Sequence, residues 1–167
     1  QDGKLLSQDG QSIQDALMAV LQDEGVVLEV RRRALEASSP FNTPHIQQYI
    51  HWAYKSDDLK LRCSSLYAMG RTQDSVWLHN IIPELQSVSV QLRYEATCAC
   101  GELGEENAVP HLIPLIDDDD LEVQMAMVTA IGKIGGPLAK RALLRCVRIG
   151  DDTIKEAAQD ALDDLEA

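Results

Sequence analysis

Four cysteines are the residues of this chain with the widest possible chemistry, as nucleophiles, metal ligands or disulfide partners. Cys63 and Cys146 stand alone, and Cys98 and Cys100 are two residues apart, so the chain has no Cys-x-x-Cys pair. On a helix, side chains two residues apart point about 200° from each other and cannot hold one metal ion. We therefore expect reduced, mostly buried thiols, which fit a cytoplasmic protein.

The other residues capable of catalysis or ligand binding form no recognised motif. The sequence has no Gly-x-Ser-x-Gly elbow, no phosphate-binding glycine loop and no His-Glu-x-x-His. Residues 117–120 are four aspartates without the central glycine and distal glutamate of a calcium loop, so we interpret them as caps for a following helix. We expect no catalytic residue, no cofactor and no metal site.

A basic cluster contrasts with the acidity around it. The net charge of the chain is −12, and residues 84–167 carry −10 of it, with seventeen acidic and seven basic groups. Such a field repels phosphate backbones, so nucleic acid is not an expected partner. Four of those seven basic residues fall within an arc of about 140° on a helix with 100° per residue. They are Lys140, Arg141, Arg145 and Arg148.

An uninterrupted repeat of 31 residues determines where these side chains lie. One column of the repeat is aliphatic, the next is long and polar, and a third is always alanine. The aliphatic column is Val30, Leu61, Leu92, Val123 and Ile154; the polar column is Arg31, Arg62, Arg93, Gln124 and Lys155; the alanines are Ala37, Ala68, Ala99, Ala130 and Ala161. Periods of roughly 20–50 residues are typical of solenoids. The four histidines, His45, His51, His79 and His111, fall at four different places of the repeat, so no repeated metal site is expected.

Each repeat is predicted to contain two helices, which we name helix A and helix B. Over residues 121–134 apolar side chains recur at steps of three and four, and Gly135-Gly136-Pro137 then ends that helix A. Helix B has apolar columns of its own, four residues apart on one face: Ile50, Ile81, Leu112, Leu143, and Tyr54, Leu85, Ile116, Val147. Single helices over residues 12–21 and 152–165 complete a set of ten.

One copy of the repeat resembles a known family. Residues 92–96 read LRYEA, residues 101–104 read GELG and residues 107–112 read NAVPHL. This pattern resembles the short HEAT repeats first noted in phycobilisome lyases. The resemblance covers roughly residues 12–165 and implies an all-α fold, a right-handed α-α superhelix or HEAT-like solenoid. We expect four full helix pairs plus half-repeat helices at both ends, in one domain over residues 12–167, after a polar tail or linker at residues 1–11.

The resemblance also suggests where a partner would bind, because in this family the B helices line a shared inner surface. Steps of 31 residues back from Arg141 reach Pro110, then His79 and then Gln48, and three such steps back from Arg145 reach Trp52. Tryptophan and arginine are enriched at interface hot spots. The candidate partner-binding residues are Gln48, Trp52, His79, Lys140, Arg141, Arg145 and Arg148.

The first functional hypothesis is therefore a scaffold that binds a protein or peptide on the face lined by the B helices, with the basic cluster suited to an acidic one. No apolar run approaches the ~20 residues that span a bilayer, so no membrane partner is expected. A second hypothesis is a phycobilin lyase or another chromophore-handling protein, which the resemblance and the aromatic residues Tyr49, Trp52, Tyr54 and Trp77 suggest. A third is a structural fragment of a larger repeat or multidomain protein.

Overall fold

The computed structural model describes residues 8–166, and their regular structure is entirely helical. The ten α-helices are α1 (Gln8–Gln22), α2 (Leu28–Ser38), α3 (Pro44–Tyr54), α4 (Leu59–Arg71), α5 (Leu78–Glu84), α6 (Val90–Leu103), α7 (Val109–Leu112), α8 (Leu121–Ile134), α9 (Gly136–Ile149) and α10 (Asp152–Glu166). Short 3₁₀ turns lie at Ser39–Phe41, Ser75–Trp77, Glu106–Ala108 and Ile113–Asp117. None of these helices is both long and apolar enough to pass through a bilayer.

The helices pair as the 31-residue period predicts. In chain order, a helix A is followed by a helix B four times: α2 then α3, α4 then α5, α6 then α7, and α8 then α9. Helix α1 is the half-repeat at one end and α10 the half-repeat at the other, so the all-α solenoid with ten helices is confirmed. Helix α1 begins at Gln8, earlier than the predicted residue 12, and Asp9 in its first turn suits the positive end of the helix dipole. Residues 1–7 of the predicted tail lie outside the described residues.

The chain divides into two compact units, Gln1–Ala68 and Met69–Ala167. In the first unit, α1 and α3 are the B-type helices, and α2 is the helix A between them. Thr43 caps α3 by accepting a hydrogen bond from the backbone N–H of Ile46, and Pro44 begins the helix. The unit's largest fully buried side chains are Leu21, Leu35, Ile46, Ile50, Leu61 and Leu66.

The first repeat departs from the predicted columns. Val30 is 48% exposed, and Ala37 is exposed as well, although both columns are buried or nearly so in later copies. The helix before α2 is the B-type helix α1, so among the described residues no helix A packs on that side of α2. Ala37 is therefore exposed, whereas Ala68, Ala99 and Ala130 of the same column are buried.

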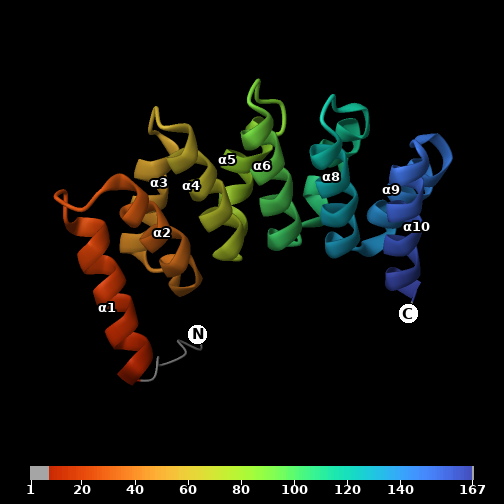
Figure 1. The fold of residues 1–167 in the computed structure, drawn as a ribbon. Helices are drawn as coiled ribbons and strands as arrows, with labels where there is room; N and C mark the ends of the chain where they lie inside the picture. The colour runs from red at the N-terminus through yellow and green to blue at the C-terminus, as the bar shows by residue number, and fades with distance from the viewer. Residues whose placement is uncertain (1–7, 167) are drawn as a thin grey trace. The chain divides into compact units, whose positions relative to one another are not determined.

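In the second unit, the A helices α6, α8 and α10 lie side by side in chain order (Figure 1). A methyl group added at Gly101 of α6 would lie 2.9 Å from the Cα atom of Ala130 on α8. The same distance separates such a methyl at Gly70 from the Cα atom of Ala99. The alanine column thus meets the glycine column of the preceding repeat, which confirms that small side chains let these helices approach closely.

Proline decides the length of the B helices in this unit. Helix α7 has only four residues and continues as a 3₁₀ turn that contains Pro114. Proline has no N–H to donate and disfavours a continued α-helix. Helix α9 has fourteen residues, because its one proline, Pro137, stands in the first turn, where the missing N–H is harmless. Gly135, with φ of 68°, ends α8 just before it.

Candidate protein-binding surfaces

Three side chains of the polar column hydrogen-bond to a backbone carbonyl that precedes their helix A. Arg31 donates two hydrogen bonds to the carbonyl oxygen of Leu21, at 3.1 and 3.3 Å. Arg93 donates to the carbonyl of Ser87 at 2.9 Å, and Gln124 donates to the carbonyl of Asp118 at 2.6 Å. These long side chains satisfy backbone acceptors that would otherwise face solvent or the core. Their role is structural, and they are not available as a repeated binding motif.

Two of the aspartates at 117–120 stabilise the turn that leads into α8. Asp120 accepts hydrogen bonds from the backbone N–H groups of Glu122 and Val123, at 2.9 and 3.2 Å, which confirms the capping interpretation for that residue. Asp118 instead pairs with Arg93 through two bonds of 2.7 and 2.8 Å, and its side chain is only 5% exposed. The Arg93 guanidinium holds the pKa of Asp118 below its usual value.

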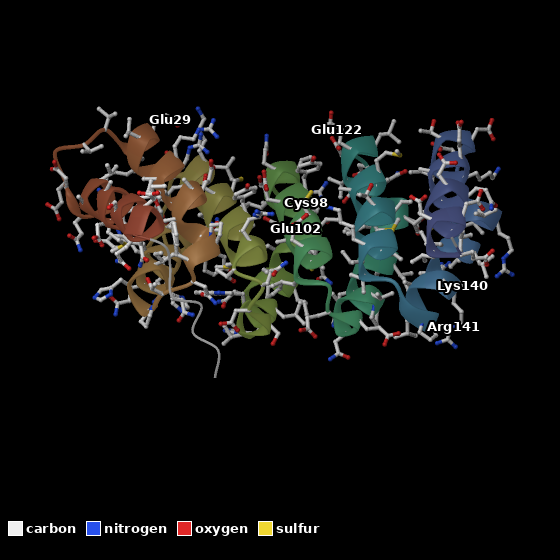
Figure 2. All side chains as sticks on the ribbon, turned by 90° about the horizontal axis from the view of Figure 1, so that it is seen from below. Glu29, Cys98, Glu102, Glu122, Lys140 and Arg141 are labelled. Carbon is white, nitrogen blue, oxygen red and sulfur yellow. The ribbon has the colours of Figure 1, made fainter. Side chains whose placement is uncertain are left out.

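The basic stripe of α9, formed by Lys140, Arg141, Arg145 and Arg148, is exposed at all four positions. Lys140 pairs with Glu166 at 2.6 Å, and Arg148 donates to the carbonyl of Leu144 on its own helix. Neither Arg141 nor Arg145 has a hydrogen-bond or ion-pair partner among the described residues. Within the second unit, Lys140 and Arg141 project on the side opposite Glu122 of α8 (Figure 2).

His79 is exposed on α5 but does not join this stripe. A full repeat separates α5 from α9, and Pro110 and Pro114 occupy the equivalent places on the helix B between them. Its Nδ1 atom lies 2.5 Å from the carbonyl oxygen of Val76, a local contact with the turn before α5.

The other predicted residues, Gln48 and Trp52, are exposed on α3 in the first unit. Trp52 is 41% exposed, and the Arg31 guanidinium lies 4.7 Å from the centre of its ring. Tyr49 meets the same ring edge-on, with 6.4 Å between the ring centres. One face of Trp52 is therefore already occupied by a cation–π contact within the chain.

One of the aromatic residues behind the chromophore hypothesis is buried. Trp77 is only 2% exposed and belongs to the core of the second unit. Its indole ring therefore contributes to packing and offers no face to a bound chromophore. Tyr54, by contrast, is half-buried at the end of α3.

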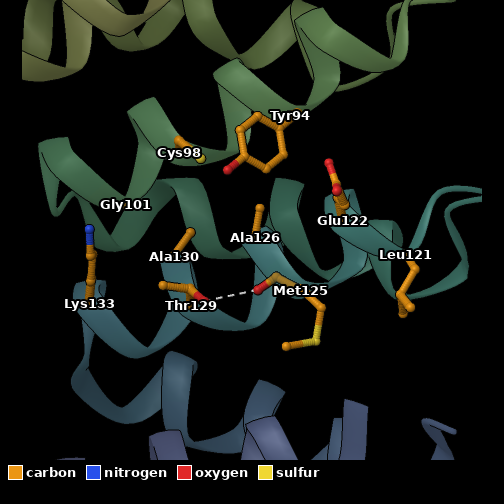
Figure 3. A pocket seen from close by; sticks show the side chains of 10 residues that line it. All are labelled: Tyr94, Cys98, Gly101, Leu121, Glu122, Met125, Ala126, Thr129, Ala130 and Lys133. Carbon is orange, nitrogen blue, oxygen red and sulfur yellow. Dashed lines mark hydrogen bonds between the residues drawn. The ribbon is translucent and has the colours of Figure 1, made fainter. Parts of the chain in front are cut away.

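A groove that the sequence did not predict lies between α6 and α8 (Figure 3). Its volume is about 600 Å³, and ten residues line it. Gly101, Ala126 and Ala130 leave room between the two helices, and Tyr94 and Met125 stand at its sides. A second hollow of about 500 Å³ follows between α8 and α10, and its acidic members are Asp160 and Asp164.

Cys98 lines the first groove, but its thiol is not activated as a nucleophile. Burial raises the pKa of its thiol, and the nearby Glu95 adds to that effect. The adjacent Cys98 in turn raises the pKa of Tyr94, so both groups stay protonated near neutral pH. Burial raises the pKa of Cys100 to about 12. All four cysteines are free, with Cys100 and Cys146 buried as predicted and the other two half-buried.

Comparison with known proteins agrees with the fold described above. The HEAT repeats family matches residues 78–163, half of the chain. The chain belongs to the HEAT-repeat family. Among 23 solved chains that match it, one is the crystal structure of an engineered protein with a TM-score of 0.67 and 17% identity, covering 95% of this chain and 81% of its own. At that identity the likeness shows the fold alone, and no curated protein matches the chain.

Within the HEAT-repeat match lie α5 to α9 and most of α10, and therefore both the basic stripe and the groove. HEAT repeats are commonly protein-interaction scaffolds that present extended binding surfaces. The signal for the groove was present in the sequence, because the first residue of each helix A also recurs at 31 residues. That column is Leu28, Leu59, Val90, Leu121 and Asp152.

Proposed function

We propose that this HEAT-repeat protein is an interaction module that binds an acidic protein or peptide through the basic stripe of α9. The observation that carries the proposal is the pair Arg141 and Arg145, exposed and without an ion-pair partner among the described residues, in the more acidic half of the chain. A stripe that only balanced nearby acids would place its guanidinium groups against them. These two guanidinium groups instead project from α9 with their donors unused.

Arginine suits this task better than lysine would. Its planar guanidinium can donate two parallel hydrogen bonds to one carboxylate and is only weakly hydrated. Because Arg141 and Arg145 have no partner to leave, binding breaks no existing ion pair. Lys140 and Arg148 already make contacts within the chain, so we expect smaller contributions from them.

The test compares two double variants with the same change in net charge. Arg141→Glu with Arg145→Glu reverses the stripe, and Lys55→Glu with Lys60→Glu reverses two exposed bases of the first unit. Partners captured from native cells by the wild type should be lost with the first variant and kept with the second. With a purified partner, association should slow at least tenfold at low salt for the stripe variant and lose most of its salt dependence. Equal capture by both variants would refute the role of the stripe.

Gln48 and Trp52 form a second candidate surface on α3. We expect Trp52→Ala to raise the dissociation rate of a partner that contacts α3, because it removes a large apolar contact area. Gln48→Ala is the matched control on the same exposed face and should change the rate much less. If both variants release the partner at the wild-type rate, α3 is not part of the interface.

The chromophore hypothesis has its own test. Mixing the protein with a linear tetrapyrrole and recording the visible spectrum detects binding directly. An unchanged spectrum removes the lyase hypothesis and leaves the interaction module. A changed spectrum that survives Trp52→Ala would place the chromophore away from α3.

A further inference from the structure

The first residue of each helix A forms a column that is partly exposed to solvent, where a polar residue would be expected. Four of its five members are nevertheless aliphatic. Leu28, Leu59, Val90 and Leu121 are between 36% and 49% exposed. In the terminal helix α10 the same place is held by Asp152. Helix packing does not require an aliphatic residue there, because α10 begins without one. The aliphatic residues of this column therefore need a reason other than folding.

The pattern continues along the exposed face of the A helices of the second unit. In steps of four residues, α6 reads Val90, Tyr94, Cys98 and α8 reads Leu121, Met125, Thr129. The equivalent positions of α10 read Asp152, Glu156, Asp160, all exposed and all acidic. Residues four apart share one helix face, so α6 and α8 each carry a largely apolar strip and α10 carries an acidic one.

The two apolar strips border the groove between α6 and α8. Gly101 and Ala130 bring the helices together, and Ala126 leaves the space between them unfilled. Figure 3 shows the Tyr94 ring reaching from α6 toward α8, with Met125 and Leu121 on the α8 side. Exposed apolar patches with a polar border are typical of interaction sites.

The charge at the groove is unbalanced toward the negative. Lys133 lies at one end and is paired with Glu102 at 2.6 Å. Glu122 lies at the other end, without a hydrogen-bond or ion-pair partner for its carboxylate among the described residues. A smaller hollow of about 280 Å³ continues past Tyr94 and contains Glu95 and Asp120. An occupant that matches this end must carry positive charge.

The shape of the site favours a helix. Both bordering helices have fourteen residues, which gives a length of about 21 Å at 1.5 Å per residue. An amphipathic helix of about three turns can place apolar residues at positions i, i+4 and i+7 along such a groove. We infer that the α6–α8 groove docks an amphipathic helix of a partner protein, whose apolar face meets Tyr94, Leu121 and Met125 and whose lysine or arginine meets Glu122.

This docking surface is independent of the α9 stripe and has the opposite chemistry. The test uses a displayed library of random 14-residue peptides, selected on the wild-type protein. The variant Leu121→Asp with Met125→Glu is the counter-selection target, because it gives α8 the residues that α10 carries at equivalent positions. Leu121 is exposed and Met125 is half-buried, and α10 carries acidic residues at both equivalent positions, so we expect the variant to fold; circular dichroism checks this.

The expected result is an enriched set of peptides that are amphipathic as helices and rich in lysine or arginine. They should bind the wild type at least tenfold more tightly than the α8 double variant, and a central proline in the peptide should abolish binding. Glu122→Gln should weaken the binding of basic peptides severalfold, and Arg141→Glu with Arg145→Glu should not change it.

Three outcomes would overturn the inference. Enriched peptides that bind the α8 double variant as tightly as the wild type would show that the groove is not their site. Enrichment of acidic or extended peptides would refute the chemistry assigned to the occupant. A concentration-dependent dimer of the wild type that the α8 double variant abolishes would identify a second copy of this chain as the occupant instead. None of these outcomes bears on the α9 stripe, whose own variants test it separately.

Discussion

The α6–α8 and α8–α10 contacts repeat the same register with different results. At the first, a methyl at Gly101 would come within 2.9 Å of backbone at Ala130; at the second, a methyl at Gly132 would lie 3.2 Å from the Ala161 side chain. The first contact opens into an apolar groove and the second into a hollow with two aspartates. The 31-residue period thus sets which helices meet, and residues outside the buried columns set what their surface can bind.

The largest expected difference in stability lies between the ion pairs that Arg93 of α6 and Lys155 of α10 make. Asp118→Asn removes the buried ion pair with Arg93 beside α6 and α8, and should lower the free energy of unfolding by about 1.5–3 kcal/mol at pH 7. The side chain of Lys155, which holds the place of Arg93 in α10, makes only an exposed ion pair with Asp152 of the same helix among the described residues, at 3.7 Å. Lys155→Gln should therefore cost under about 1 kcal/mol. Urea unfolding of both variants measures the difference.

The Asp118 variant should also respond to pH with a definite sign. The folded-state pKa of Asp118 lies below its usual value because Arg93 holds the carboxylate. Its stabilisation is present above the unfolded-state pKa near 3.9, and it is lost as the pH falls through the folded-state value. The stability difference between wild type and Asp118→Asn should shrink below about pH 4. A difference that stays constant down to pH 2 would contradict the ion pair.

The next largest difference concerns the alanines. Ala130 is 2% exposed against the Gly101 backbone, so Ala130→Leu should overpack the contact and cost roughly 1–3 kcal/mol. Ala161 is half-buried in the terminal helix, so Ala161→Leu should cost less than half as much. Equal losses in thermal melts of the two variants would mean that the two contacts are equally tight.

The glycines give a smaller and more discriminating test. Gly101→Ala would bring its methyl against backbone atoms, which only a shift of α8 can relieve. That strain should exceed the gain of about 0.5–1 kcal/mol from replacing glycine inside a helix, so a net loss is expected. Gly132→Ala meets only a methyl group at 3.2 Å, and we expect it to be neutral or slightly stabilising. Chemical denaturation of the pair decides between these signs.

The smallest expected effect is on the surface. Leu121→Asp with Met125→Glu should change stability by no more than about 1 kcal/mol in total, because Leu121 is exposed and Met125 is only half-buried. A much larger loss would mean that the apolar strip of α8 supports the fold, which would remove the reason for treating it as a docking surface. Leu144→Asp on α9, another exposed leucine, is the matched control.

The ten helices and their order were predictable because buried columns repeat strictly, as Ile50, Ile81, Leu112 and Leu143 show by being fully buried. The exposure of Val30 and Ala37 was not predictable, because it depends on which helices pack against α2, and the period alone does not show that. The predicted surface on the B helices remains a prediction. Its residues are exposed. Arg31 of helix A contacts Trp52 of helix B, and the repeat pattern does not show that these two columns meet.

The α6–α8 groove was missed for a physical reason. Sequence patterns reveal buried faces, whereas a groove arises from small residues on two helices whose spacing only the fold determines. Val90 and Leu121 did share a column, but an apolar column ordinarily indicates packing. The acidic replacement at Asp152 was the one visible sign that this column faces solvent.

The short helix α7 has a consequence for the motions of the molecule. Pro110 and Pro114 donate no backbone hydrogen bonds, and the 3₁₀ turns on either side of α7 replace regular α-helical bonds with poorer ones. Its anchors Leu112 and Ile116 are nevertheless buried. Amide hydrogens along residues 106–117 should therefore exchange with solvent faster than those of α6 and α8, although their side chains belong to the same core. The third repeat then pairs a persistent helix A with a helix B that opens locally, and the segment that leads into Asp118 is the one that opens.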